Sequence, residues 1–294
     1  MSTDDRRQLA EKFQELHRGP KLLTLPNVWE VAGARVFEEA GFDAIGTTSR
    51  GVAASHGYPD GEAMAREEML AVVKRIADSV SIPVTADMEA GYGATPEAVA
   101  QTAAGVIDAG AVGINVEDGR NIMGDRTGAQ LADLALQIEK LRAIRDTAAT
   151  MSVPIVINAR TDVFWLEVGE PEDRLAHAVE RGNAYVEAGA DCLFVPGVKD
   201  RDMIARLVDE LNGPINVLAV KGSPPIRELE EIGVARVSLG SGPYRATLAL
   251  LKTIASELTG LGTYRSFTEE SVRYGELIDA LAREGETHID YPSE

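Results

Sequence analysis

The sequence predicts an α/β protein built as a closed (β/α)8 barrel, a TIM barrel, with one additional C-terminal helix. Short apolar runs rich in β-forming residues recur eight times, and each is followed by a segment with helical periodicity. The runs are continuously apolar rather than alternating, which is typical of parallel strands covered on both faces. Eight such units in about 240 residues favour the barrel over an open doubly wound sheet. A nucleotide-binding sheet of that kind would also carry a G-x-G-x-x-G turn after its first strand, and "PNVWEVAGA" has none.

The predicted strands share an apolar composition and cover residues 22–28, 44–49, 83–89, 113–118, 154–160, 192–197, 214–219 and 236–240. Helical segments such as 96–111 and 171–190 begin with proline or acidic residues and end with glycine. The related phrases "EAGFDAI", "DAGAVGI", "EAGADCLF" and "EIGVARVSL" mark four joints where a helix ends and a strand begins. We expect the N-terminal helix and the barrel within residues 1–262. Residues 263–294 form a C-terminal helical extension, with a helical pattern over 266–286.

The composition argues against a nucleic-acid-binding, membrane-spanning or disulfide-bonded protein. The 47 acidic against 29 basic residues give a formal charge of −18, which repels nucleic acids and anionic membranes. No apolar run approaches the ~20 residues of a membrane helix, and the N-terminus has the pattern of an amphipathic helix rather than a signal peptide. Cys192 is the single cysteine, so neither an internal disulfide nor a cysteine metal cluster can form. We therefore expect a cytoplasmic protein whose partner is a small molecule, with Cys192 in the core.

Polar side chains gather at the predicted carboxyl ends of the strands, where barrel enzymes carry their chemistry. The second strand ends in polar residues and leads into a loop with an acid, and the third and fourth strands end in acids. The fifth ends in an arginine, and the seventh carries an asparagine. The candidate site residues at these ends are Thr48, Ser49, Asp60, Asp87, Glu89, Glu117, Arg160 and Asn216.

Asp87, Glu89 and Glu117 would place three carboxylates at one corner of the barrel mouth. Residues two apart in an extended chain point to the same side, and the adjacent strand adds the third acid. At ~4–5 Å and an effective dielectric near 20, each like-charge pair costs on the order of 3–4 kcal/mol. An all-oxygen set without histidine or cysteine suits Mg²⁺ or Mn²⁺. Arg160 could pair with one acid or hold a substrate carboxylate, and a solvated acidic rim is the alternative to a metal site.

These motifs resemble the isocitrate lyase and phosphoenolpyruvate mutase superfamily. The resemblance covers about residues 20–262 and rests on four segments in order. They are "PNVWEVAGARVFEEAGFDAIGTTS", "ADMEAGYG", "INVED" and "INARTD". The resemblance implies that Asp87, Glu89 and Glu117 hold magnesium, usually through water.

The resemblance also implies roles in substrate binding and catalysis. Arg160 matches an arginine that binds the substrate carboxylate. Thr48 and Ser49 match a segment that contacts the carboxylate and 2-oxo oxygen of a pyruvate-like group. Asp60 matches a loop acid close to the reacting group. Asn216 is a further candidate for substrate binding.

The loop after the fourth strand departs from the named family members. It reads "EDGRNIMGDRTGAQ" (117–130) and lacks both the K-[KR]-C-G-H motif of the isocitrate lyases and the K-x-N-S motif of the mutase. Asn121 is present, and Arg120 or Arg126 could replace the missing lysine charge. Cleavage of isocitrate by the usual route is therefore not expected, and neither is phosphoenolpyruvate mutase activity in the strict sense.

With those two activities set aside, we expect the protein to be a magnesium-dependent carbon–carbon lyase or decarboxylase. It would act on a small 2-oxoacid or hydroxy-dicarboxylic acid through a metal-stabilised, pyruvate-type enolate. The alternatives are a phosphonomutase or P–C bond hydrolase acting on a phosphonopyruvate-like substrate, and a non-catalytic barrel that binds 2-oxoacids. Family members exchange C-terminal helices between subunits, so the resemblance also implies a homo-oligomer, either a dimer or a tetramer.

Overall fold

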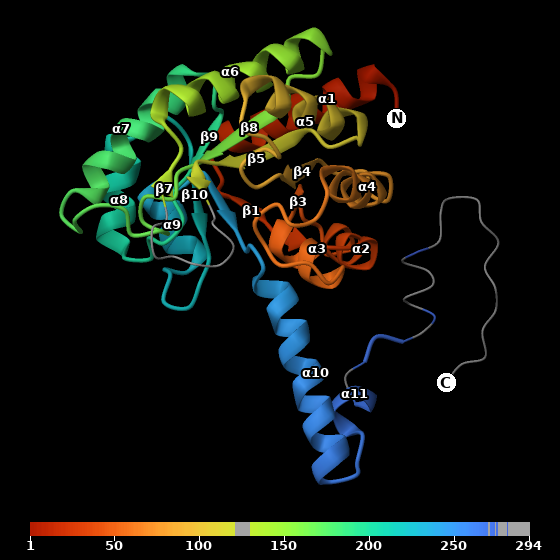
Figure 1. Ribbon diagram of the computed structural model, residues 1–294. Coiled ribbons are helices and arrows are strands. Elements are labelled where there is room, and N and C mark those ends of the chain that lie inside the picture. The colour runs from red at the N-terminus through yellow and green to blue at the C-terminus, as the bar shows by residue number, and fades with distance from the viewer. Residues whose placement is uncertain (121–129, 270, 274, 276–280, 282–294) are drawn as a thin grey trace.

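The computed structural model describes residues 1–120, 130–269, 271–273, 275 and 281. Nine parallel strands form one sheet in the order β1-β11-β10-β9-β8-β5-β4-β3-β2 (Figure 1). The strands are β1 (Leu23–Leu25), β2 (Asn27–Val28), β3 (Ile45–Thr47), β4 (Val84–Asp87), β5 (Gly113–Glu117), β8 (Val156–Arg160), β9 (Cys192–Phe194), β10 (Ile215–Leu218) and β11 (Arg236–Ser238).

The first predicted strand is split in two at Pro26. β1 pairs with β11 at one edge of the sheet, and β2 pairs with β3 at the other. Because β1 and β2 follow each other directly in the chain, these two pairings close the sheet into a barrel. Proline has no N–H to donate, but the carbonyl of Pro26 accepts a hydrogen bond from the amide of Gly46. The predicted (β/α)8 barrel is confirmed, with its first strand in two parts.

At least one helix follows each predicted strand. The helices are α1 (Thr3–Arg18), α2 (Val31–Glu39), α3 (Ser49–Ser55), α4 (Arg66–Ala77), α5 (Pro96–Asp108), α6 (Leu134–Thr150), α7 (Arg174–Glu187), α8 (Arg201–Glu210), α9 (Ile226–Ile232), α10 (Gly242–Gly260) and α11 (Arg265–Thr268). Helices α2 to α9 surround the sheet, whereas α1 lies across one end of the barrel and α10 and α11 extend away from the other. The expected helices 96–111 and 171–190 correspond to α5 and α7. Most of the expected helix 266–286 lies outside the described residues.

The glycine in the repeated joint phrase has a backbone reason. Each of the four glycines follows a helix and has a positive φ, between 84° and 103°. Glycine adopts this left-handed conformation without strain, so it ends the helix and turns the chain toward the next strand. The four residues are Gly41, Gly110, Gly189 and Gly233.

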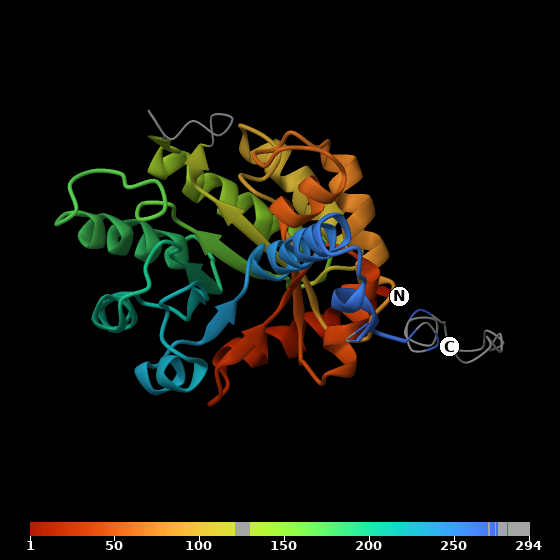
Figure 2. The ribbon, with the colours of Figure 1, turned by 90° about the horizontal axis from the view of Figure 1, so that it is seen from below.

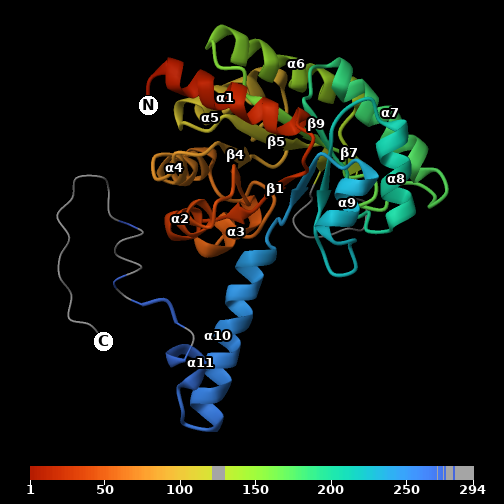
Figure 3. The same cartoon turned by 180° about the vertical axis from the view of Figure 1, so that it is seen from behind.

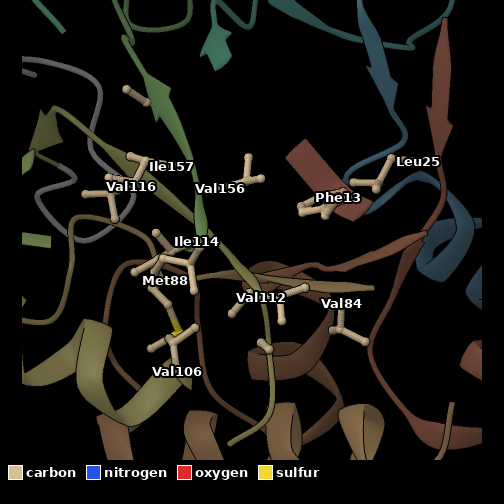
Figure 4. Close-up of a cluster of buried hydrophobic side chains, with 14 of the residues drawn as sticks. Phe13, Leu25, Val84, Met88, Val106, Val112, Ile114, Val116, Val156 and Ile157 are labelled. Carbon is tan, nitrogen blue, oxygen red and sulfur yellow. The ribbon is translucent and has the colours of Figure 1, made fainter. Parts of the chain in front are cut away.

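The core lies between the strands and the surrounding helices. Val106 of α5 packs with Met88 and Ile114, and all three are fully buried (Figure 4). A short antiparallel hairpin, β6 (Gly119–Arg120) with β7 (Gln130–Leu131), flanks the segment 121–129 and was not predicted. Asn121 and Arg126, the proposed replacements in that loop, lie outside the described residues, and the side chain of Arg120 is not described.

Helix α1 closes the end of the barrel opposite to α10 (Figures 1 and 3). Its buried residues are Ala10, Phe13 and His17. The Phe13 ring comes so close to β5 that a Cβ on Gly113 would lie 2.7 Å from it. The amino-terminal end of the barrel is therefore filled by apolar and aromatic side chains of α1, which leaves the carboxyl end of the strands for the site.

Helix α10 projects from the other end of the barrel, and Figure 2 views it from that side. None of its 19 residues, all of them described, is buried. At its base the ring of Tyr244 packs edge to face on Trp29, with ring centroids 5.1 Å apart. Among the described residues, no helix combines the length and the apolar composition needed to cross a membrane.

Candidate active site

A cavity of about 640 Å³ lies inside the barrel at the carboxyl ends of the strands. Six of the eight predicted site residues line it: Thr48, Ser49, Asp60, Asp87, Arg160 and Asn216. The other two, Glu89 and Glu117, line a neighbouring cavity of about 410 Å³. Glu117 also shares a small hollow with Ser49, Asp60 and Arg160, and this hollow connects the two groups.

Asp87, the last residue of β4, is held at both carboxylate oxygens. Its Oδ2 accepts hydrogen bonds from the backbone N–H (2.9 Å) and the hydroxyl (2.8 Å) of Ser49. Its Oδ1 accepts one from the side-chain amide of Asn115 (2.8 Å). Asn158 in turn donates to Asn115 (2.8 Å). Because these contacts come from neighbouring strands and from the start of α3, they fix the orientation of the Asp87 carboxylate.

Glu89 does not continue the strand as the sequence argument assumed. β4 ends at Asp87, and Glu89 has a φ of 50°, so it is not two positions along an extended chain. Its Oε2 accepts hydrogen bonds from the backbone N–H groups of Gly61 (2.7 Å) and Glu62 (2.6 Å). Burial, with the charges of Asp60 and Asp87, raises the pKa of Glu89 to about 7. The side chain faces the loop that carries Asp60.

Glu117 pairs with Arg160, at 2.6 Å between Oε2 and Nη1. Arg160 also bonds Asp162 through Nε (2.6 Å) and Nη2 (3.1 Å). Burial raises the pKa of Glu117 well above its usual range, although the Arg160 charge opposes this. For Arg160 itself burial lowers the pKa, but Asp162 and Glu117 outweigh burial and raise it. Of the two roles that the sequence left open for Arg160, the structure shows the pairing with acids.

A second buried network holds the backbone of Asp162 in place. Asp118 accepts hydrogen bonds at Oδ2 from Arg181 (2.7 Å) and from the hydroxyl of Tyr185 (2.6 Å). Its Oδ1 accepts the backbone N–H of Asp162 (2.8 Å). The Asp118 side chain is fully buried. The position of Asp162, and through it of the Arg160 guanidinium, therefore depends on an ion pair that does not line the cavity of about 640 Å³.

Asp60 and Thr48 are both linked to the first turn of α3. Asp60 pairs with Arg50 at 2.7 Å and is partly exposed. Thr48 is the N-cap of α3, and its hydroxyl accepts from the backbone N–H of Gly51 (3.4 Å). Asn216 is 1% exposed, and neither atom of its side-chain amide has a hydrogen-bond partner among the described residues.

The donor chemistry suits a hydrated hard cation better than a directly ligated one. Among the described residues, no three histidine, cysteine, aspartate or glutamate side chains converge closely enough to hold a metal directly. Asp87, Glu89 and Glu117 nevertheless supply only oxygen atoms, and burial, together with neighbouring negative charges, raises the pKa of the two glutamates. Most of their oxygens already accept protein hydrogen bonds. Mg²⁺ keeps several of its waters, so it would be held through them at this corner.

Sequence reasoning missed three residues of this region, Arg50, Asn115 and Arg236, and it placed Asp118 at the end of its strand without assigning it a role. Asn115, like Asn158 and Arg236, stands two positions from another polar residue within a short strand, and such pairs point into the barrel. This spacing of polar residues was the available signal. Arg50 and Asp118 have no comparable pattern, since their partners lie on other elements.

The family model described as phosphoenolpyruvate phosphomutase matches residues 13–259. The chain is 30% identical to 2-methylisocitrate lyase of Escherichia coli over 88% of its own length and 89% of that protein. It is also 30% identical to 2,3-dimethylmalate lyase of Eubacterium barkeri, over 96% and 97%. A crystal structure from Burkholderia cenocepacia, described as a lyase/mutase, has a TM-score of 0.87 and 32% identity over 96% of this chain and 98% of that one.

The matched family model spans the whole barrel, from α1 into α10. The relatives cover both the cavity and the strand ends that hold its polar residues. The superfamily inferred from the four sequence motifs is thus confirmed. This chain belongs to the phosphoenolpyruvate phosphomutase family, within the superfamily of isocitrate lyases and phosphoenolpyruvate mutases.

Proposed function

We propose that this protein is a magnesium-dependent lyase that breaks a carbon–carbon bond, by cleavage or decarboxylation, in a small 2-oxoacid or hydroxy-dicarboxylic acid. Relatives named as lyases of 2-methylisocitrate and 2,3-dimethylmalate support this class of reaction. The observation that carries the proposal is the excess of buried negative charge beside the cavity. Glu89 and Glu117 both have raised pKa values there, and Asp87 lies next to them. A bound divalent cation would relieve this repulsion and stabilise negative charge that develops on an oxygen of the reacting acid.

The chain's own residues would position that acid. Ser49 fixes Asp87 with two donors at one oxygen, and Asn115 fixes the other oxygen. Arg160 uses three of its N–H groups on Asp162 and Glu117, and its guanidinium has five. We propose that the remaining donors bind the substrate carboxylate. The rings of Trp165 and Phe194, 6.0 and 5.7 Å from the guanidinium carbon, limit where that carboxylate can lie.

The loop with Asp60 is coupled to the acidic corner. Asp60 stands directly before Gly61 and Glu62, whose amides hold Glu89. Arg50 holds Asp60 from the other side. We propose that Asp60 acts close to the reacting group, and that Thr48, Ser49 and Asn216 contact the substrate. A movement of this loop would change both the position of Asp60 and the hydrogen bonds to Glu89.

Proton NMR of candidate acids with the protein and MgCl₂ tests the reaction. Loss of the substrate signal, or exchange of the methyl protons of pyruvate with solvent, is expected for at least one acid of a panel of 2-oxoacids and hydroxy-dicarboxylates. No turnover and no exchange across the panel would contradict the lyase.

The cation position has a separate test. Glu89→Ala should abolish the magnesium-dependent rise in Tm that oxalate causes, whereas Glu67→Ala, on the exposed face of α4, should retain it. If Glu89→Ala keeps the effect, the cation is held elsewhere. This result would not depend on knowing the substrate.

The second candidate function is phosphorus–carbon chemistry, as a phosphonomutase or P–C bond hydrolase. The description of the matched family model favours it. Phosphorus NMR of phosphonopyruvate with the protein and MgCl₂ distinguishes it, since either reaction moves the phosphorus resonance. Binding of 2-oxoacids without any conversion would instead identify a non-catalytic barrel.

We also propose that the protein is cytoplasmic and forms a homo-oligomer, either a dimer or a tetramer, in which α10 packs on a neighbouring subunit. The lone cysteine and the acidic composition support the first part. The exposed leucines of α10 support the second: Leu248, Leu250, Leu251 and Leu258 are each at least 40% exposed. A helix that exposes several leucines to water is stabilised when another subunit buries them.

A further inference from the structure

Arg236 is a buried cation that forms no close ion pair within the described part of the chain, although the negative charge of Asp87 acts on it and partly offsets the effect of burial on its pKa. It is the first residue of β11, it is 3% exposed, and it lines the cavity. Among the described residues it forms no ion pair, and its Nε has no hydrogen-bond partner. Burial lowers the pKa of Arg236 to about 10, so the side chain is still charged at neutral pH. A buried charge without a close ion pair is costly, which makes its retention informative.

Among the residues that the structure describes, the hydrogen-bond partner of this guanidinium is a neutral imidazole. Nη1 of Arg236 lies 3.5 Å from Nε2 of His17. Nδ1 of His17 lies 2.7 Å from the carbonyl oxygen of Phe13, which can only accept, so Nδ1 carries the proton and Nε2 is unprotonated. Burial and the Arg236 charge lower the pKa of His17 to about 3. His17 therefore orients Arg236 without neutralising it.

Two other arginines, the partly buried Arg145 and the buried Arg181, show what a structural role looks like. Arg145 donates to the carbonyls of Ile155 and Gly189 and pairs with Asp191. Arg181 bonds Asp118 and also the carbonyl of Ala132. Each tethers separate segments through several strong acceptors, and Arg236 has no such set. Packing of the barrel alone does not account for a guanidinium at this position.

The strand register places Arg236 relative to the proposed site. Glu117, Arg160, Phe194, Asn216 and Arg236 are successive partners across five neighbouring strands. The row starts at the last residue of β5 and ends at the first residue of β11, so it descends from the mouth of the barrel to its floor. The last four residues all line the cavity. Of the four residues that line the cavity, Arg160 lies nearest the mouth and Arg236 nearest the floor, and among the described residues only Arg160 forms ion pairs with acids.

Asn216 supplies a second unsatisfied group beside Arg236. The two residues are register partners on β10 and β11, and both face the cavity. The amide of Asn216 is buried with no hydrogen-bond partner at either atom among the described residues. Buried polar groups are almost always hydrogen-bonded, so an orphan amide next to an unpaired cation indicates a ligand. A carboxylate accepts hydrogen bonds from the Arg236 guanidinium and from Nδ2 of Asn216 at once.

We propose that Arg236 and Asn216 bind a carboxylate at the far end of the substrate, so that this protein acts on acids with two carboxylates held apart along the barrel axis. This inference rests on the proposed function, which places the reacting end of the acid at Asp87, Ser49 and Arg160. The cavity of about 640 Å³ has room for a longer acid than pyruvate. Arg236 is then a specificity-determining residue rather than a catalytic one.

Matched pairs of acids test the proposal by isothermal titration calorimetry in MgCl₂. 2-Oxoglutarate and 2-oxopentanoate have five carbons each and differ only in whether the chain ends in a carboxylate or a methyl group. 2-Oxoadipate and 2-oxohexanoate form the next pair. The natural protein should bind at least one diacid about 10- to 100-fold more tightly than its partner, as expected for hydrogen bonds to a charged group. Arg236→Met should bring that ratio to about 1 without changing the Kd of the monoacid.

Two further variants separate binding from folding. Arg236→Lys retains the charge and should keep part of the ratio, and Arg206→Met, which removes an exposed guanidinium on α8, should keep all of it. Without ligand, Arg236→Met should have a Tm equal to or above that of the natural protein, because it removes a buried charge without a close ion pair. A clearly lower Tm would overturn the proposal and make Arg236 structural.

Three other results would overturn the proposed carboxylate site at Arg236 and Asn216. Equal affinity for diacid and monoacid in the natural protein would overturn this inference while leaving the proposed function intact. Failure to bind either acid would contradict both. An Arg236-dependent rise in Tm with sodium chloride that equals the rise with the diacid would mean that the floor holds an inorganic anion, and this too would overturn the proposal.

Discussion

Ser49 donates two hydrogen bonds, from its backbone N–H and its hydroxyl, to the same carboxylate oxygen of Asp87. Only the second depends on the side chain. Ser49→Ala should therefore leave α3 intact but let the Asp87 carboxylate rotate, and magnesium-dependent binding of oxalate should weaken by about 10-fold. Calorimetric titration measures this. Ser55→Ala, at the other end of α3 and bonded to the carbonyl of Val52, should bind as the natural protein does. Equal binding by both variants would show that the hydroxyl does not position Asp87.

The buried group Asp118, Arg181 and Tyr185 should determine stability more than chemistry. Arg181→Met leaves the Asp118 carboxylate buried and uncompensated, which should lower the free energy of unfolding by about 3–5 kcal/mol. Tyr185→Phe removes one donor and should cost about 1–3 kcal/mol. Urea denaturation measures both. Arg206→Ala breaks an exposed pair on α8 and should cost no more than about 1 kcal/mol, and a similar loss in all three variants would refute the role of burial.

His17 should make the fold sensitive to acid. The pKa of His17 in the folded protein, about 3, lies below its ordinary value of 6.5, so the unfolded chain binds a proton that the folded chain excludes. Protonation of His17 does not lower the free energy of unfolding above pH 6.5. As the pH falls from 6.5 toward 3 it lowers that free energy progressively, by about 2 kcal/mol at pH 5. His17→Gln should reduce the slope of unfolding free energy against pH between 6.5 and 5. An unchanged slope would mean that His17 is protonated in the folded state.

The exposed face of α10 should govern assembly. Leu251 is 58% exposed on a helix with no buried residue, and a charge there would oppose its burial against another subunit. Leu251→Glu should lower the mass of the assembly measured by light scattering after size exclusion, with unchanged helical content by circular dichroism. A substitution on the same helix that keeps its apolar character, Leu251→Met, is the control. A monomeric natural protein would refute the proposed oligomer.

The sequence predicted the barrel well because its signals are local. Apolar strand runs, prolines at helix starts and the glycines at helix ends all act within a few residues, and the four joint glycines have the left-handed backbone that the repeated phrase indicated. The split at Pro26 was not predicted because β1 and β2 pair with strands at opposite edges of the sheet. The hairpin of β6 and β7 was not predicted because strands of two residues are too short to show an apolar pattern.

The site was predicted less completely, because several of its contacts join distant segments. Asp87, Ser49 and Arg160 were found from motifs at strand ends. The extended-chain argument did not hold beyond Asp87, because Glu89 turns into the left-handed region and bonds a loop 27 residues earlier. The contact of Arg236 with His17 joins residues 219 positions apart, and no spacing within the chain indicates it.

The split first strand has a consequence for how the protein is made. β1 finds its partner in β11, about 210 residues later, so the barrel has the long-range connectivity that slows folding. During synthesis β1 keeps one open edge until residue 238 has emerged, and open strand edges invite pairing with other chains. A chain ending before β11 would lack Arg236 and the pairing of β1 with β11. Truncation there is therefore expected to give aggregates rather than a smaller barrel. Closure of the ring is thus a single late event on which the whole fold depends.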